Sequence, residues 1–296
     1  MSNDGRERLI ELMADPWRLG AAVLCCAAAM LPGEACAPRP VLPNGERIPE
    51  FTSEALLHGS ALTLHLAPAA AAAAARPLVV YGSGDGGWFG AAVGMFDLIA
   101  AAGYPTAGFS SRALLKIEQA GHAPVSGEQV ADSYRTILAA ARRDLGLSPD
   151  APVVLTGWSR GASLAVVAAS SRDVDPAVTG IVAIGLPRED ELDAEPGDDD
   201  DPPPASEAIA ARGRNASRER LMYPLLARIG PRRSAVVQAS GDRYLPAAQA
   251  RALFGADSDV RRFFEVAANN HRFSGGRPEL QQALLEAIEW AGGPQP

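Results

Sequence analysis

The sequence predicts an α/β fold in which helices cover both faces of a doubly wound, mostly parallel sheet. Short runs of apolar residues recur along the chain, and turn residues or polar segments follow them. They span residues 78–81, 106–109, 153–156, 181–184, 235–239 and 263–266. Strands that are apolar throughout are typical of parallel sheets, because helices bury both of their faces. These runs therefore predict the strands of the sheet.

Helical segments separate several of these runs. The clearest begins at Ser126, where Gln129 completes a capping box, and its apolar positions fall on one face. A second helix is expected over residues 162–170, directly after a strand. A third, over residues 279–291, places Leu280 and Ile288 on one apolar face and closes the domain. The alternation of strand and helix predicts that binding groups gather at the carboxyl ends of the strands.

Composition limits the classes of partner. The chain has 296 residues, of which 47% are hydrophobic, and its formal net charge is −8. A single core fits this size, and we place the main domain at residues 77–296. Nucleic acid is not expected as a partner, because phosphate binding needs a basic surface. The sequence predicts no particular oligomeric state.

The first 37 residues have the pattern of a targeting segment. Residues 19–31 are apolar, follow Arg18 and precede the small residues 35–37, which predicts a signal peptide or an N-terminal membrane tether over residues 1–37. We therefore expect a periplasmic or exported protein, with inner-membrane association if the tether is retained. An ordinary N-terminal helix is the alternative. All 3 cysteines lie in this segment, so we expect neither a disulfide nor a cysteine metal site in the main domain.

Two further segments differ from the strand and helix pattern. Residues 38–76 form a Pro/Ala-rich approach that contains a short hairpin, which we expect to turn at Gly59-Ser60. Residues 187–206 form an acidic insertion that contains three consecutive prolines, and we expect that they cannot belong to the core. A solvated loop is the expected structure, although attraction of cationic head groups is an alternative.

Gly157-Trp158-Ser159-Arg160-Gly161 carries the strongest chemical signal. It follows the strand expected at residues 153–156 and leads into a helix, which is the setting of the nucleophile elbow of α/β-hydrolases. The flanking glycines permit a sharp turn that presents the serine hydroxyl to substrate. An ordinary turn at a helix entry is the alternative interpretation. We therefore expect the α/β-hydrolase fold, with Ser159 as the nucleophile.

A serine nucleophile needs a base, and the base needs a carboxylate that orients it. Asp242 follows one expected strand and His271 follows the last, so the order Ser, Asp, His is the one this fold requires. Asp257 and Asp259 are alternative acids, but they precede the last strand. Among the other histidines, a structural role is expected for His58 and His65, and His122 falls in a loop.

The glycine-rich loop at residues 82–88 follows the first core strand and is suited to an oxyanion hole. We assign one donor to the amide of Arg160, directly after the nucleophile, and the other to the amide of Ser83. A phosphate-binding loop is the competing interpretation. It fails because no Lys-Ser/Thr pair follows the glycines, and no cofactor or metal is expected.

The same motifs resemble a known family. Ser83-Gly84-Asp85-Gly86-Gly87-Trp88, residues 108–112, the Ser159 elbow and His271-Arg272-Phe273 resemble the bacterial AcvB/VirJ virulence-protein family of periplasmic α/β-hydrolase-like proteins. The resemblance implies hydrolysis of the aminoacyl ester of aminoacyl-phosphatidylglycerol, a membrane phospholipid, with release of the amino acid.

Such a substrate carries an ammonium group beside the scissile ester, so a nearby carboxylate would help to bind it. Asp85 is the candidate, and Trp88 and Trp158 are expected to make further substrate contacts. The alternative for Asp85 is that it only fixes its own loop through local hydrogen bonds. For the whole protein, the alternatives are a general carboxylesterase or thioesterase, and a non-catalytic binding protein that assists secretion or virulence.

Overall fold

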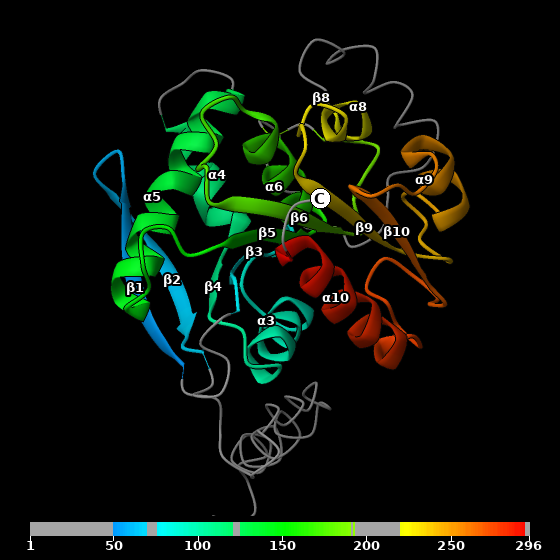
Figure 1. Ribbon diagram of the computed structural model, residues 1–296, viewed down its shortest axis with the longest axis horizontal. Helices are drawn as coiled ribbons and strands as arrows, with labels where there is room; N and C mark the ends of the chain where they lie inside the picture. The colour runs from blue at the N-terminus through cyan, green and yellow to red at the C-terminus, as the bar shows by residue number, and fades with distance from the viewer. Residues whose placement is uncertain (1–49, 70–75, 121–124, 191, 193–219, 294–296) are drawn as a thin grey trace, which may run out of the picture. The chain divides into compact units, whose positions relative to one another are not determined.

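A computed structural model describes residues 50–69, 76–120, 125–190, 192 and 220–293. Within these residues an eight-stranded sheet has the order β1-β2-β4-β3-β5-β6-β9-β10 (Figure 1). Its strands are β1 (Phe51–Leu57), β2 (Ser60–Ala67), β3 (Leu78–Gly82), β4 (Thr106–Phe109), β5 (Val153–Trp158), β6 (Val178–Ile184), β9 (Arg233–Ala239) and β10 (Arg261–Val266). The pairs β1·β2 and β2·β4 are antiparallel, and the other neighbours are parallel.

Every strand predicted from an apolar run is confirmed, and several extend further than predicted. β5 continues to Trp158, and β9 begins at Arg233. The core strands are buried on both faces. On β3, for example, Val80 packs into one hydrophobic cluster and Val79 and Tyr81 pack into the other. This two-residue alternation shows that two separate helical layers cover the sheet.

The helices divide between these layers, as the sequence predicts for a doubly wound sheet. α3 (Ala91–Ala101) and α10 (Arg277–Gly292) lie together on one face (Figure 1). The opposite face carries α4 (Ser111–Gln119), α5 (Gly127–Leu145), α6 (Arg160–Ser170), α8 (Met222–Leu226) and α9 (Ala247–Phe254). Helices α3, α4, α8 and α9 are additional to those predicted from the sequence.

The three predicted helices are confirmed. Ser126 caps α5 with both hydrogen bonds of the capping box, since its side chain accepts from the Gln129 amide and its own amide donates to the Gln129 side chain. Gly146 ends the helix in the left-handed conformation. On α10, Leu280 and Ile288 are buried as expected.

The hairpin exists, but its turn lies one residue earlier than predicted. Leu57 pairs with Ser60, so His58 and Gly59 form the two-residue turn. Both have positive φ, 50° for His58 and 82° for Gly59, which is the geometry that matches the twist of paired strands. Because β2 also pairs with β4, the hairpin extends the same sheet.

Several sequence predictions lie outside the described residues, namely the segment 1–37, His122 and most of the insertion 187–206. At the start of that insertion, β7 (Glu189–Asp190) pairs antiparallel with β8 (Arg220–Leu221). Leu192 is 2% exposed and packs into a hydrophobic cluster, so the prediction that no part of the insertion belongs to the core is wrong at this residue. Among the residues that the structure describes, no helix is both long enough and apolar enough to cross a membrane.

Candidate active site

Ser159 occupies the turn between β5 and α6 in a strained conformation. Its φ is 55° and its ψ is −119°, a region that residues with a side chain rarely adopt. The Ser159 amide donates to the Ile184 carbonyl at 2.8 Å, which ties the turn to the end of β6. The strained serine stands at the carboxyl edge of the parallel strands, where this architecture places its binding groups.

The two glycines of the elbow are required by close backbone contacts. A Cβ atom at Gly161 would lie 2.2 Å from the Gly82 carbonyl oxygen, and one at Gly157 would lie 2.3 Å from the Gly161 carbonyl carbon. Backbone atoms cannot move aside as flexible side chains do. The glycines therefore let the start of α6 pack directly on the ends of β3 and β5.

We expect Gly161→Ala to lower the free energy of unfolding by about 3 kcal/mol, because the added methyl group overpacks a rigid backbone contact. Gly94→Ala is the matched control, since Gly94 lies in α3 and a Cβ there meets nothing within 4 Å. It should be neutral or stabilising by about 0.5–1 kcal/mol. Urea unfolding curves of both variants check this, and equal stabilities would contradict the packing argument.

Asp242 and His271 form a direct hydrogen bond. The His271 Nδ1 and the Asp242 Oδ2 are 2.6 Å apart, and Asp242 is 1% exposed. The carboxylate also accepts from Gln238 Nε2 at 2.9 Å and from the Tyr244 amide at 2.9 Å. The Gln238 amide group and the Tyr244 backbone amide are both donors. They fix its orientation and complement a charged carboxylate.

The His271 ring is held beside the elbow by three neighbours. Trp158 stacks near it with ring centroids 5.7 Å apart, and Tyr244 meets it edge-on at 5.0 Å. A Cβ at Gly185 would lie 2.9 Å from His271 Cε1, and Gly185 follows the Ile184 carbonyl that binds the Ser159 amide. The Ser, Asp and His expected from sequence therefore gather at one edge of the sheet.

The two ring nitrogens of His271 have different surroundings. Nδ1 faces the Asp242 carboxylate, whereas Nε2 is buried and has no hydrogen-bond partner within the described part of the chain. In a neutral ring with Nδ1 protonated, Nε2 is the acceptor. It is therefore the ring nitrogen that is able to accept a proton.

The predicted oxyanion donor at Ser83 is wrong. Its amide donates to the Phe109 carbonyl at 3.0 Å and so belongs to the sheet. The next amides of the loop, those of Gly84 and Asp85, donate to no backbone carbonyl among the described residues. A Cβ at Gly84 would lie 3.6 Å from Ser159 Cβ. The Gly84 and Asp85 amides are therefore the candidates for the second donor, while the Arg160 amide opens α6, where first-turn amides have no intrahelical acceptor.

Asp85 pairs with a protein group. Its Oδ1 lies 2.9 Å from Arg160 Nε, and Asp190 Oδ1 lies 3.4 Å from the same nitrogen. The Asp190 side chain is 5% exposed, whereas that of Asp85 is 44% exposed. Asp85 thus ties the glycine-rich loop to the residue after the nucleophile, and part of its carboxylate still meets solvent.

Trp88, which the sequence predicts to contact substrate, packs against side chains of the sheet and of α3. It stacks on His65 with ring centroids 4.2 Å apart and meets Phe96 edge-on. A Cβ at Gly108 would lie 2.1 Å from its Cη2 atom. Trp88 therefore anchors the loop to the sheet. His65 has the expected structural role, since it also pairs with Glu50.

Trp158, the other expected substrate contact, is also engaged within the protein. Its Nε1 donates to the His271 carbonyl at 3.2 Å.

Tyr223 is a buried residue close enough to Asp242 to be affected by its charge. Burial and, to a smaller extent, the charge of Asp242 raise the pKa of the Tyr223 hydroxyl above the ordinary value. Tyr223 accordingly stays protonated and donates to the Leu186 carbonyl.

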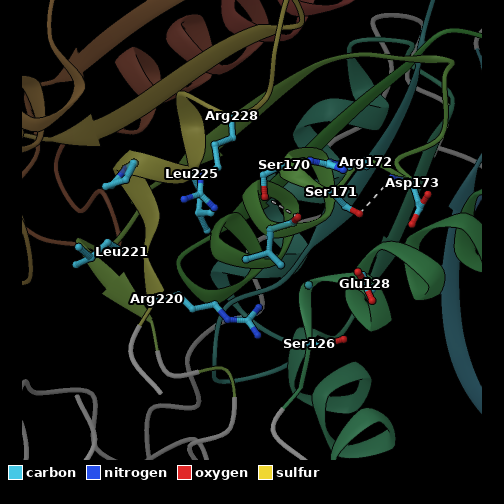
Figure 2. Close-up of a pocket in the computed structure, with 13 residues that line it drawn as sticks. Ser126, Glu128, Ser170, Ser171, Arg172, Asp173, Arg220, Leu221, Leu225 and Arg228 are labelled. Atoms are coloured by element: carbon cyan, nitrogen blue, oxygen red, sulfur yellow. Dashed lines mark hydrogen bonds between the residues drawn. The ribbon is translucent and has the colours of Figure 1, made fainter. Parts of the chain in front are cut away.

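A pocket of about 890 Å³ lies at the opposite end of α6 (Figure 2). Its lining includes Val167, Ser170, Arg172, Arg220, Leu225 and Arg228. α6 runs from Arg160 to Ser170, and a helix rises 1.5 Å per residue, so the pocket is roughly 15 Å from the elbow. It is therefore separate from Ser159 and His271.

No group of acidic, histidine or cysteine side chains with metal-binding geometry occurs among the described residues. Comparison with protein-family models finds no match. No curated protein sequence is significantly similar to the chain.

Solved structures do resemble it. A Thermus thermophilus protein has 14% identity and a TM-score of 0.53, with 83% of this chain and 100% of that chain covered. An esterase domain from Rhodothermus marinus has 15% identity and a TM-score of 0.53, with coverages of 82% and 98%. A Xanthomonas campestris α/β serine hydrolase without a lid has 13% identity and a TM-score of 0.52, with coverages of 87% and 100%. The chain therefore has the α/β-hydrolase fold.

Proposed function

We propose that the protein is a serine hydrolase that cleaves carboxylic esters with Ser159, His271 and Asp242. The observation that carries this proposal is the 2.6 Å contact between Asp242 and His271 at the edge where Ser159 is held at φ 55°. A binding module gains nothing from a strained serine next to an oriented histidine. The combination is the arrangement that activates a hydroxyl.

The reaction follows from the positions of these groups. Ser159 Oγ attacks the ester carbonyl while His271 Nε2 accepts its proton, and Asp242 stabilises the imidazolium that forms. The negative charge on the former carbonyl oxygen meets the Arg160 amide and an amide of the glycine-rich loop. His271 then protonates the departing alcohol, which leaves an acyl group on Ser159. Water, deprotonated by His271, releases the acid and regenerates the serine.

Hydrolysis of a panel of acyl esters and thioesters by the purified protein tests this function. We expect release of acid in amounts equal to the alcohol from esters or to the thiol from thioesters, at a rate that depends on Ser159. A non-catalytic binding protein would show no hydrolysis above that of Ser159→Ala, and this result would reject the proposal.

The finer proposal concerns substrate and location: an exported enzyme that removes the aminoacyl group from aminoacyl-phosphatidylglycerol. The resemblance of residues 83–88 to the AcvB/VirJ loop and the apolar residues 19–31 support it. A half-exposed carboxylate at Asp85, adjacent to the elbow through Arg160, also suits a substrate with an ammonium group. The competing substrates are neutral soluble esters and thioesters. Release of free amino acid from vesicles that contain the lipid tests the proposal, and no release would reject this substrate.

Asp85→Asn distinguishes ammonium recognition from loop anchoring. If the exposed part of Asp85 meets the substrate ammonium, turnover of aminoacyl esters should fall roughly ten- to a hundred-fold and that of neutral esters much less. Asp190→Asn is the matched control, because Asp190 faces the same Arg160 nitrogen but is buried. It should affect both ester classes equally. Equal losses for both classes in Asp85→Asn would assign Asp85 to the loop alone.

A further inference from the structure

Trp158 contacts both of the loops that must work with Ser159. On one side, its indole N–H donates to the backbone of His271. On the other side, its six-membered ring packs near Gly84 of the glycine-rich loop at residues 82–88, which holds the candidate oxyanion donors and is called the oxyanion loop below. We propose that Trp158 is a positioning residue that holds His271 and the oxyanion loop in register with the adjacent nucleophile. The proposal rests on the proposed ester hydrolase and adds a residue to its machinery.

The contact with His271 fixes the loop after β10. The Trp158 Nε1 donates to the His271 carbonyl at 3.2 Å, and the two rings stack with 29° between their planes. The loop itself is strained, since Phe273 has a φ of 57°. A hydrogen bond to the backbone and a stacked ring together restrain both the position and the tilt of the imidazole.

The contacts on the other sides leave little room for the indole to move. A Cβ at Gly84 would lie 3.2 Å from Trp158 Cε3, and one at Gly185 would lie 3.4 Å from Trp158 Cδ1. The ring is therefore confined between the oxyanion loop, the end of β6 and His271. Trp158 precedes Ser159 directly, so one side chain links the nucleophile turn to the base and to the oxyanion loop.

Small displacements of catalytic groups have large effects on rate. A shift of about 1 Å lowers a rate roughly 10²-fold. Trp158→Phe keeps an aromatic ring but removes the N–H, and we expect kcat to fall roughly ten-fold with KM within about two-fold. Trp158→Leu removes the ring as well and should lower kcat roughly a hundred-fold. The graded loss with partial rescue by phenylalanine is the signature of positioning.

The experiment measures kcat and KM of both variants on a neutral acyl ester, with thermal unfolding as a check of the fold. Trp290→Phe is the matched control, because Trp290 lies on α10 near Arg233 and away from the elbow. Full activity in both Trp158 variants would overturn the proposal. A raised KM with unchanged kcat would also overturn it and would assign Trp158 to substrate binding.

A second measurement tests the positioning role of Trp158 independently of ester hydrolysis. Proton NMR of the intact protein detects the His271 Nδ1–H, which resonates at low field when a carboxylate accepts it. We expect this resonance in the unmutated protein and its broadening by faster solvent exchange in Trp158→Leu, or in Trp158→Phe if the leucine variant does not fold. An unchanged resonance overturns the positioning role. Absence of hydrolysis by the unmutated protein, with the resonance sensitive to Trp158, would reject only the ester hydrolase.

Discussion

Ser159→Ala is expected to lower the rate of ester hydrolysis by about 10⁶-fold while the protein remains folded. The three catalytic side chains act as one unit, so removal of the nucleophile abolishes the benefit of the other two. Alanine adopts the backbone conformation of Ser159 as readily as serine does, and the Ser159 side chain does not cap α6. Steady-state kinetics on a soluble ester measures the loss.

Ser170→Ala provides the matched control for this variant. Ser170 lies at the other end of α6, in the separate pocket. It should have the activity of the unmutated protein, and both variants should unfold at similar temperatures. Substantial activity in Ser159→Ala would contradict the assignment of the nucleophile.

Asp242→Asn is expected to lower kcat by about 10⁴-fold. Asp242 Oδ2 accepts from Gln238 Nε2 at 2.9 Å and lies 2.6 Å from His271 Nδ1. An asparagine that keeps its oxygen toward the Tyr244 amide would place its NH₂ group against both of these donors. The imidazole would then carry its proton on Nε2 instead of Nδ1, and Nε2 could no longer accept the Ser159 proton.

Asp257→Asn is the control, because Asp257 is one of the alternative acids that the sequence allows. The structure pairs Asp257 with Arg251 and with the Phe263 amide. We expect kcat to remain within about two-fold in this variant. A large loss in Asp257→Asn together with an active Asp242→Asn would contradict the assignment of the acid.

Much of the fold follows from local pattern. Apolar runs predict the core strands, because a buried parallel strand needs apolar side chains on both faces. The capping box at Ser126 predicts the start of α5, since its two hydrogen bonds depend only on neighbouring residues. The order of Ser159, Asp242 and His271 along the chain also predicts where the site forms, because the fold places the ends of their strands at one edge.

The features that the sequence analysis missed depend on register and on side-chain direction. Ser83 loses its oxyanion role because Gly82 pairs with Phe109, which directs the Ser83 amide to a sheet carbonyl. Trp88 turns into the sheet because Gly108, distant in sequence, leaves space for it. The ion pair of Asp85 with Arg160 likewise joins separate segments. Composition and spacing do not encode such contacts.

Labelling with a fluorophosphonate probe tests the central claim most directly, because the probe reacts only with an activated serine. We predict that the unmutated protein gains one probe group, that peptide mass spectrometry locates it on Ser159, and that Ser159→Ala remains unlabelled. Labelling should also slow strongly in Asp242→Asn, since the base is then misdirected. An unlabelled native protein, or a probe on a serine other than Ser159, would contradict the proposed active site.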